Sequence, residues 1–448
     1  MEKHSLTREL LRLAWPVLVA QLAVMANGVI DTVMAGRISA VDLAAIGIGA
    51  AVYVTVFVTT MGVLLALTPT VAHLYGAGRH AEIGAEVRQS FWIAVALAAV
   101  AMAVLWHPGP LLALSQLEPE VEAKVRAYLD AIAWSVPAAL AFRLFYGFSS
   151  GIGRTRPIMV FNLIGLALKI PLNALFMYGG FGLPALGAPG CAVATTLIAS
   201  TTAIGGWAWC VRHPDYREFA LLAGFEWPDW RRIAAMLRLG MPIGATFLVD
   251  VTAFTFMALF IARLGPVVSG AHQIAANLAA LTFMLPLALG NATAVLAGQA
   301  LGAGNPARAR QAAWRGIGIG LGIGVVVSLL LWLGSARLAA LYTPDAAVRA
   351  AATPLIALVA AYHLVDALQA VTVNALRGYR KSTVPMAIYA FALWGVGLAG
   401  GYALGFGDLA GAPMGAAGFW LAAVASLALA GILVAAYLDY VSRAACRS

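Results

Sequence analysis

The chain repeats itself along its length, and this repeat restricts the folds open to it. The pairs of equivalent residues 226 positions apart are Pro16 and Pro242, Arg37 and Arg263, Gly76 and Gly302, and Gly78 and Gly304. Farther along, the GAPG and GAAG segments match at an offset of 228, since Gly187 corresponds to Gly415. The chain therefore consists of two homologous halves in tandem. In a strongly apolar chain, such a duplication is typical of transporters, in which the substrate site lies between two repeats.

Composition places both halves in a membrane. Hydrophobic residues make up 62% of the chain and charged residues 10%, whereas soluble proteins carry about 25% charged residues. Apolar runs recur near the length of roughly 20 residues that crosses a bilayer. We predict an all-α membrane protein with about twelve transmembrane helices, located near 10–36, 43–73, 89–107, 124–150, 157–179, 188–211, 234–262, 270–300, 312–334, 347–375, 384–405 and 414–440.

The predicted helices divide into an N-terminal lobe at 1–211, an interlobe linker at 212–233 and a C-terminal lobe at 234–448. Lys and Arg concentrate in short cytoplasmic loops of membrane proteins. With both termini cytoplasmic, most of the 28 Lys and Arg residues fall on the inner side. This bias accounts for the net charge of +9 without a nucleic-acid partner. An even number of helices per lobe predicts a pseudo-two-fold axis along the membrane normal.

Several function classes lack their sequence signals. The first apolar segment is long and has no small-residue cleavage pattern, so no cleavable signal peptide is expected. Cys191, Cys210 and Cys446 are scattered, which favours neither a disulfide framework nor a metal cluster. The chain has no GxxxxGK, HExxH or GxSxG motif. The glycines of GIGIGLGIG at 316–324 lie on one helix face, as in close helix packing. We expect neither enzymatic activity nor an organic cofactor.

The chemistry is then expected in the few ionisable residues within the membrane, which we count as three Asp and one Lys. Asp31, Asp250 and Asp366 each interrupt an apolar helix, and burying a carboxylate in hydrocarbon costs several kcal/mol. Asp250 and Asp366 belong to the same half, and two adjacent carboxylates are a natural site for H⁺ or Na⁺. Tyr362 lies one turn before Asp366 on the same helix face. A structural role, in which each carboxylate ties neighbouring helices together, is the alternative.

Lys169 is the second anomaly. It interrupts the apolar stretch LALKIPLN, where Pro171 breaks the helical hydrogen bonding and Asn173 shares the face of Lys169. A buried ammonium needs a partner. Asp31 is the deep acid of this half, with Asp130 as a shallower candidate, so we expect an Asp31–Lys169 contact. The alternative is a lysine that extends to the membrane interface.

Five stretches carry a family resemblance: DTVMAGRISAVDLAAIGIG, NLIGLALKIPLNALFMYGGFGLPALGAPGCAVAT, VDVTAF, SGAHQIAAN and LVDALQAVTVNALRGYRKSTVP. They resemble the multidrug and toxic compound extrusion (MATE) transporters of the NorM branch. The resemblance covers nearly the whole chain and implies two six-helix lobes in a bacterial inner membrane. It also implies a monomer that exports cationic, amphipathic drugs in exchange for inward H⁺ or Na⁺ by alternating access.

The resemblance also implies roles for individual residues. Asp31 corresponds to the acid of the first lobe, and Asp366 with Tyr362 to the cation site of the second lobe. Gln273 and Asp345 correspond to positions that face substrate. The chain departs from the family at two positions: it has Asp250 in place of the usual Glu, and Lys169 where NorM proteins resemble NIPLN. An ammonium at 169 occupies the place of a metal cation beside Asp31.

Three alternative functions are weighed against drug export. A lipid-linked saccharide flippase of the same superfamily requires many basic residues for pyrophosphate, and a membrane-embedded enzyme requires a nucleophile or metal cluster. A channel fits the duplicated halves less well than alternating access does. An excess of acids in the membrane favours a cationic, aromatic cargo, held by charge attraction and by rings such as Trp134 and Tyr146.

Overall fold

The structure is a computed structural model that describes residues 2–109, 112, 117–180, 182–221, 224–408 and 411–447. Over these ranges the chain is almost entirely helical, and a single bridge between Gly180 and Leu183 is its one sheet-like feature. Eleven helices are long and apolar enough to cross a membrane, or twelve when one bent pair counts as a single span. The prediction of an all-α, twelve-span membrane protein is therefore confirmed.

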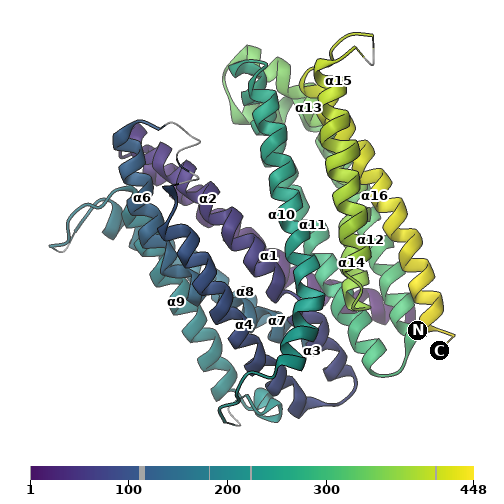
Figure 1. Cartoon of the computed structure of the whole chain (residues 1–448). Coiled ribbons are helices and arrows are strands. Elements are labelled where there is room, and N and C mark those ends of the chain that lie inside the picture. The colour runs from purple at the N-terminus through teal and green to yellow at the C-terminus, as the bar shows by residue number, and fades with distance from the viewer. Residues whose placement is uncertain are drawn as a thin grey trace. The chain divides into compact units, whose positions relative to one another are not determined.

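By their internal packing the helices form two compact units (Figure 1). The N-terminal unit spans Val19–Gly244 and contains the part of α1 (Glu2–Gly36) from Val19 onward and the part of α10 (Trp230–Ala262) up to Gly244. Its other helices are α2 (Ala40–Leu64), α3 (Leu67–Gly76), α4 (His80–Trp106), α6 (Pro119–Ala133), α7 (Ser135–Gly151), α8 (Arg156–Met177), α9 (Ala188–Arg212) and the 3₁₀ helix η1 (Pro214–Phe219).

Two spans that the sequence predicts as single helices are interrupted by turn residues, and in both the cause is a proline. The span at 43–73 divides into α2 and α3, and the span at 124–150 divides into α6 and α7 with a bend of 44°. A proline removes the hydrogen bond to the carbonyl four residues earlier. Pro69 removes the bond to Leu65 and Pro137 the bond to Ala133, which are the points where α2 and α6 end.

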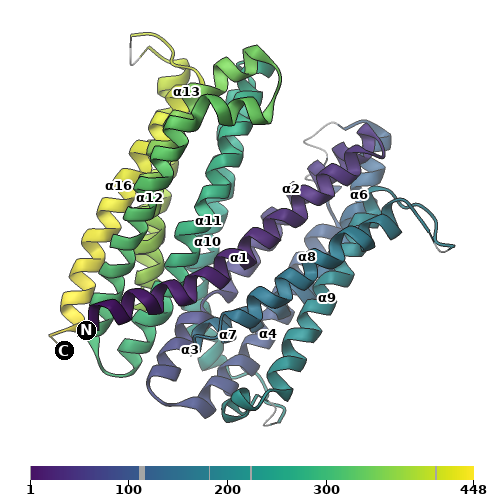
Figure 2. The ribbon, with the colours of Figure 1, turned by 180° about the vertical axis from the view of Figure 1, so that it is seen from behind.

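The C-terminal unit consists of residues up to Leu18 and from Ala245 onward. After α10, its helices are α11 (Pro266–Gly302), α12 (Pro306–Tyr342), α13 (Ala346–Gly378), α14 (Thr383–Ala390), the π-helix η2 (Phe391–Ala399), α15 (Gly400–Phe406) and α16 (Ala416–Ala445). Helix α13 packs against α11, α12 and α16, as Figure 2 shows. Leu10 and Ala14 of α1 join the buried core of α11, α12, α13 and α16.

The two unit boundaries lie at equivalent positions of the repeat. One boundary follows Leu18 and the other follows Gly244, each two residues after the equivalent prolines Pro16 and Pro242. The first turns of α1 therefore pack with the second half of the chain, and those of α10 with the first half. The predicted lobes at 1–211 and 234–448 follow the repeat, whereas packing assigns these helix starts to the opposite unit.

Backbone geometry repeats as the sequence does. Gly78 and Gly304 both have φ of 69°, where helices α3 and α11 have just ended. Gly187 and Gly415, the residues before α9 and α16, have φ of 62° and 58°. A side chain is strained at such positive φ angles, so glycine satisfies the same local requirement in both halves. The tandem duplication is thus also present in three dimensions.

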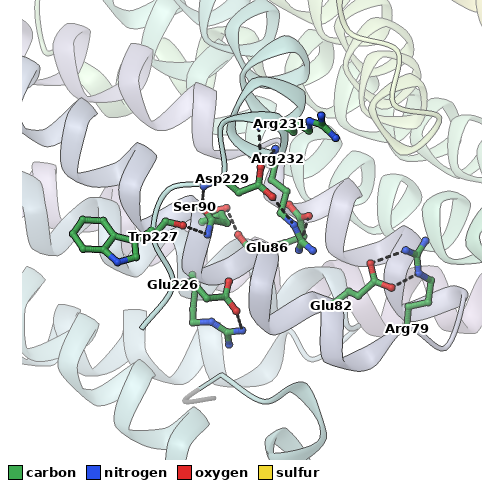
Figure 3. Close-up of polar contacts among 11 residues, drawn as sticks. Arg79, Glu82, Glu86, Ser90, Glu226, Trp227, Asp229, Arg231 and Arg232 are labelled. Atoms are coloured by element: carbon green, nitrogen blue, oxygen red, sulfur yellow. Dashed lines mark hydrogen bonds and ion pairs between the residues drawn. The ribbon is translucent and has the colours of Figure 1, made fainter. Parts of the chain in front are cut away.

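The segment that follows η1 lies against α4 within the N-terminal unit (Figure 3). Arg88 Nη2 lies 2.5 Å from Glu226 Oε1. The amide of Gln89 donates to the carbonyl of Trp227 at 3.0 Å and accepts from the backbone N–H of Asp229 at 2.8 Å. The hydrogen bond from Arg88 holds the pKa of the Glu226 carboxyl below its usual value. The described part of the interlobe linker is therefore docked on one unit.

Candidate functional site

The N-terminal unit brings together the three polar residues that the sequence singles out there. Lys169 Nζ lies 2.8 Å from Asp31 Oδ1, and Asn173 Nδ2 donates to the same oxygen at 2.7 Å. Lys169 also donates to Thr195 Oγ1 on α9 at 2.6 Å. Asp31 comes from α1, while Lys169 and Asn173 lie one turn apart on α8 around Pro171. The expected contact between Asp31 and Lys169 is therefore present in the structure.

This ion pair is enclosed by protein. The side chain of Lys169 is 2% exposed and that of Asp31 is 15% exposed, and Asn173 is fully buried. A buried charge pair is stable only when its remaining hydrogen-bonding capacity is used, and Asn173 and Thr195 fulfil that role here. The ammonium neutralises the carboxylate, so this cluster carries no net charge. Lys169 is therefore the cation that lies directly beside the Asp31 carboxylate.

The C-terminal unit holds a different cluster, made of two carboxylates and two tyrosines. The Tyr389 hydroxyl on α14 donates to Asp250 Oδ1 on α10 at 2.6 Å. Asp366 and Tyr362 on α13 are buried, at 4% and 5% exposure. The four groups lie within electrostatic range of one another. Among the described residues, no Lys or Arg forms an ion pair with Asp250 or Asp366.

Aromatic rings pack against the tyrosine of this second cluster. Tyr362 packs edge-on against Phe254 and Trp420, with ring centroids 6.2 Å and 5.6 Å apart. The carboxylate and phenol oxygens are the hard ligands that Na⁺ accepts, and the carboxylates also accept protons. Within the described ranges, there is no group of three or more His, Cys, Asp or Glu side chains that could hold a metal ion. Asp250 and Asp366 are thus the candidate ligands for a small cation in this unit.

Helix irregularities accompany both clusters. Pro171 interrupts the hydrogen bonding of α8 next to Lys169, and the π-helix η2 begins two residues after Tyr389. Trp394 of η2 donates to the carbonyl of Val249, the residue before Asp250, at 3.3 Å. π-Helical turns within longer helices are frequent at functional sites. In each unit the polar cluster therefore lies where the backbone departs from regular α-helix.

Gln273 and Asp345, which the family resemblance assigns to substrate, lie elsewhere on the C-terminal unit. Both are exposed. Asp345 is the N-cap of α13 and accepts from the backbone N–H groups of Ala347 and Val348 at 2.7 and 3.2 Å. Within the described residues, no hydrogen bond joins either side chain to the two-carboxylate cluster. The structure therefore gives Asp345 a capping role.

The two aromatic residues expected to contact cargo have different settings. Trp134 lies at the break between α6 and α7, is 62% exposed, and packs edge-on against Trp106. Tyr146 on α7 is 4% exposed, with the Arg143 guanidinium 5.3 Å from its ring centroid. The Trp134 ring is thus exposed, whereas the Tyr146 ring is buried and lies next to the Arg143 guanidinium.

Sequence reasoning missed several polar residues of the spans, including Thr195 beside Lys169. Tyr389 was overlooked because it reaches Asp250 from a helix 139 positions away. Asp42 was regarded as a helix-end residue, yet it is 2% exposed and accepts from Lys124 Nζ at 2.8 Å. Arg143 lies inside α7, so the count of one basic residue in the membrane is wrong. The signal for Arg143 was present in the sequence, as a charge within the apolar run LAFRLFYGF.

Comparison with known proteins agrees with the duplicated architecture. The MatE family profile matches the chain twice, at residues 16–175 and 242–403. The chain belongs to the MatE family. The two matches begin at Pro16 and Pro242, the first pair of equivalent residues in the repeat. The family resemblance seen in the sequence is therefore confirmed.

Full-length relatives carry multidrug-resistance names. A probable multidrug resistance protein NorM of Aromatoleum aromaticum is 42% identical over 432 residues, which cover 96% of this chain and 93% of the relative. The multidrug resistance protein PmpM of Pseudomonas aeruginosa is 40% identical over 428 residues, which cover 95% of this chain and 90% of that protein.

Solved structures share the fold at low sequence identity. The eukaryotic MATE transporter AtDTX14 aligns over 98% of both chains with a TM-score of 0.89 and 16% identity. The Vibrio cholerae MATE transporter VcmN in its bent form covers 99% of this chain and 98% of its own, with a TM-score of 0.86 and 20% identity. The MatE chain described here thus has the fold of MATE transporters.

Proposed function

We propose that this MatE protein is a multidrug efflux antiporter that exports cationic, amphipathic compounds in exchange for inward H⁺ or Na⁺. The observation that carries the proposal is the cluster of the half-buried Asp250 and the buried Asp366, which lacks a basic partner among the described residues. Buried carboxylates are costly in a membrane, and they mark ion pathways. The multidrug-resistance names of the full-length relatives support export of drugs.

In this proposal the C-terminal cluster binds the coupling ion. Asp250 and Asp366 supply the charge, and Tyr362 supplies an additional oxygen. Asp31 of the N-terminal unit attracts cationic drugs, while Lys169 acts as a tethered counter-ion that an incoming drug displaces. Gln273, at the surface of α11, and Asp345 both contribute to contact with the substrate. Alternating access couples the binding of the ion to the release of the drug, because an antiporter must not hold both ligands stably at once.

The proposal also covers the oligomeric state, the membrane and the orientation of the protein. It works as a monomer in the bacterial inner membrane, with both termini cytoplasmic and without a resident cofactor. The first turns of α1 and the last turns of α16 share one hydrophobic core, which supports a common side for the two ends of the chain. The concentration of Lys and Arg in the loops of that side supports its cytoplasmic assignment.

Transport in inside-out vesicles tests the proposal. Ethidium uptake is followed while the vesicles are energised alternately by a pH gradient and by a Na⁺ gradient, with vesicles lacking the protein as the control. We expect uptake with at least one gradient and its collapse when that gradient is dissipated. Ethidium uptake that is the same with and without each gradient contradicts antiport. Transport of a lipid-linked saccharide without any drug transport favours the flippase alternative.

A further inference from the structure

The interlobe linker carries three large aromatic side chains that are exposed. These residues, the linker aromatics, are Phe225, Trp227 and Trp230, and they are 71%, 78% and 75% exposed. They are exposed although the segment itself is docked on α4 through Arg88 and Gln89. In Figure 3 the Trp227 ring points away from the ion pairs of the same segment. Large apolar side chains that gather on an exposed surface mark a site of interaction.

The linker aromatics lie beside membrane-spanning helices. Phe225 packs edge-on against Trp92 of α4, with ring centroids 5.8 Å apart, and against Trp227 at 5.3 Å. The indole N–H of Trp92 donates to the carbonyl of Glu226 at 3.1 Å. Helix α4 is one candidate membrane span, and α10, which begins at Trp230, is another. Because tryptophan is enriched where a membrane meets water, this location suits the boundary of the bilayer.

The docked linker exposes positive charge, because each of its acidic side chains already contacts a base. The pairs are Asp215 with Arg154, Glu218 with His80 at 3.0 Å, Glu226 with Arg88 at 2.5 Å, and Asp229 with Arg232 at 3.4 Å. The remaining arginines of the linker are Arg212, Arg217 and Arg231. These linker arginines are exposed, and none forms an ion pair with a described residue. Unpaired positive charge therefore flanks the linker aromatics in the sequence.

We infer that the interlobe linker is a binding surface for anionic phospholipids. The linker aromatics lie in the headgroup region of the bilayer, and the linker arginines attract the phosphate oxygens of the lipid. An acidic soluble protein would also meet the arginines. The contact of Phe225 with the membrane-spanning α4 favours lipid as the partner, because it places the rings at the bilayer. This surface lies apart from both polar clusters, so the inference holds for either coupling ion.

Fluorescence quenching tests this surface on the full-length protein. The protein is placed in nanodiscs that contain phosphatidylglycerol and phosphatidylcholine in equal amounts, with bromine on the acyl chains of one lipid or of the other. Trp227→Phe is measured in parallel, and its difference from the wild type is the quenching at Trp227. We expect phosphatidylglycerol to quench Trp227 about fivefold more than phosphatidylcholine, which is the enrichment that one arginine at an anionic surface produces.

Two triple variants, each measured with and without Trp227→Phe, locate the preference. The first replaces the linker arginines and combines Arg212→Gln, Arg217→Gln and Arg231→Gln. Its ratio of quenching should fall to about one, while both lipids still quench Trp227, because the rings stay at the bilayer. The control removes the same charge from exposed bases of the C-terminal unit and combines Arg8→Gln, Lys381→Gln and Arg447→Gln. It should keep the fivefold preference.

The wild type alone can overturn the inference, even if a triple variant does not fold. If neither lipid quenches Trp227, the ring faces water or a soluble partner, and the membrane surface is wrong. If both lipids quench it equally, the linker does not select anionic headgroups. A preference that persists without the linker arginines, or one that the control loses equally, assigns the selectivity to other bases or to net charge and overturns the inference. Loss of the preference in the first triple variant alone supports it.

Discussion

The two units share one repeat but use its positions differently. In the N-terminal unit Asp31 is neutralised by Lys169 at 2.8 Å. In the C-terminal unit Asp250 accepts from a tyrosine at 2.6 Å, and the buried Asp366 lies within electrostatic range of Asp250. The positions equivalent to Asp31 and Asp250, at an offset of 226, are occupied by the apolar residues Met257 and Val24. Duplication preserved the scaffold, and the charges were placed independently in each half.

This difference has a physical consequence. A carboxylate that is already paired with an ammonium has little to gain from binding a small cation. Two carboxylates without a basic partner repel each other and gain strongly when a proton or metal ion enters. The C-terminal cluster is therefore suited to ion exchange, whereas the N-terminal cluster is suited to a ligand that displaces or accompanies an internal cation. Each of the following predictions tests that division.

The largest effect is expected for the C-terminal carboxylates. Asp250→Asn and Asp366→Asn should each reduce gradient-driven ethidium efflux by on the order of 100-fold, because either change removes charge that couples ion binding to transport. The measurement is initial uptake rate in inside-out vesicles at equal amounts of inserted protein. Asp408→Asn, which alters an exposed residue after α15, is the matched control. Near-normal transport by both single variants would remove the C-terminal cluster from the mechanism.

A second prediction concerns the ion pair. Lys169→Asn leaves the Asp31 carboxylate without its cation, and an unpaired buried charge costs about 3–5 kcal/mol. We expect a lower melting temperature in Na⁺-free buffer and its partial recovery with Na⁺. We also expect Na⁺-dependent ethidium efflux and a higher apparent affinity for cationic drugs. The thermal scan is run with and without Na⁺.

The double variant Lys169→Asn with Asp31→Asn is the comparison for that experiment. It has neither charge, so its stability and efflux should not respond to Na⁺. If the single variant behaves like the wild type, the ammonium does not act as a counter-ion, and the contrast between the two units loses its basis.

A third prediction addresses the hydrogen bond to Asp250. Tyr389→Phe keeps the ring but removes the hydroxyl that donates at 2.6 Å. Hydrogen bonds to charged groups contribute about 1.5–3 kcal/mol, so the half-maximal concentration of the coupling ion should shift by about tenfold. Tyr402→Phe, an exposed tyrosine of α15, serves as the control. An equal shift in both variants would mean that Tyr389 has no specific role.

A smaller effect is expected at equivalent backbone positions of the repeat. Gly153 and Arg380 follow α7 and α13 with φ of 79° and 57°. A left-handed conformation costs about 1–2 kcal/mol for a residue other than glycine. Arg380→Gly should therefore raise the stability of the protein by about 1 kcal/mol, measured as a higher melting temperature. Arg380→Ala, which removes the charge but keeps the strain, should produce no such gain.

The smallest effect concerns the docked linker and pH. Because the pKa of Glu226 is lowered by Arg88, its contribution is present above the ordinary carboxyl pKa of about 4.3 and is lost as the pH falls through the folded-state value. Hydrogen exchange at 224–229 should be constant between about pH 8 and 6 and show less protection in more acidic solution. In Glu226→Gln the protection should no longer depend on this titration. Identical profiles for the two proteins would contradict the assignment.

Some of these features were readable from the chain itself. Apolar runs of bilayer length and the 226-residue offset predict the helices, the duplication and the family. Lys169 was recognisable because a charge in an apolar run needs a partner, and Asp31 was the deep acid in the same half. Tyr389 was not recognisable, since a tyrosine in an apolar helix is ordinary in sequence. Arg143 was overlooked because each charged residue was assigned to a loop or to the membrane from predicted helix ends, and the sequence places these ends only approximately.

The sequence by itself determined the class of this MatE protein, because hydropathy, proline positions and repeated glycines act locally along each helix. Only the tertiary structure decided which polar groups meet. The ammonium of Lys169 could have met Asp130, yet helix packing places it beside Asp31, where Asn173 also donates. The Tyr389 hydroxyl likewise reaches Asp250 only through the packing of helices far apart in sequence. Contacts of that kind depend on how helices rotate and cross, and side-chain periodicity leaves these angles open.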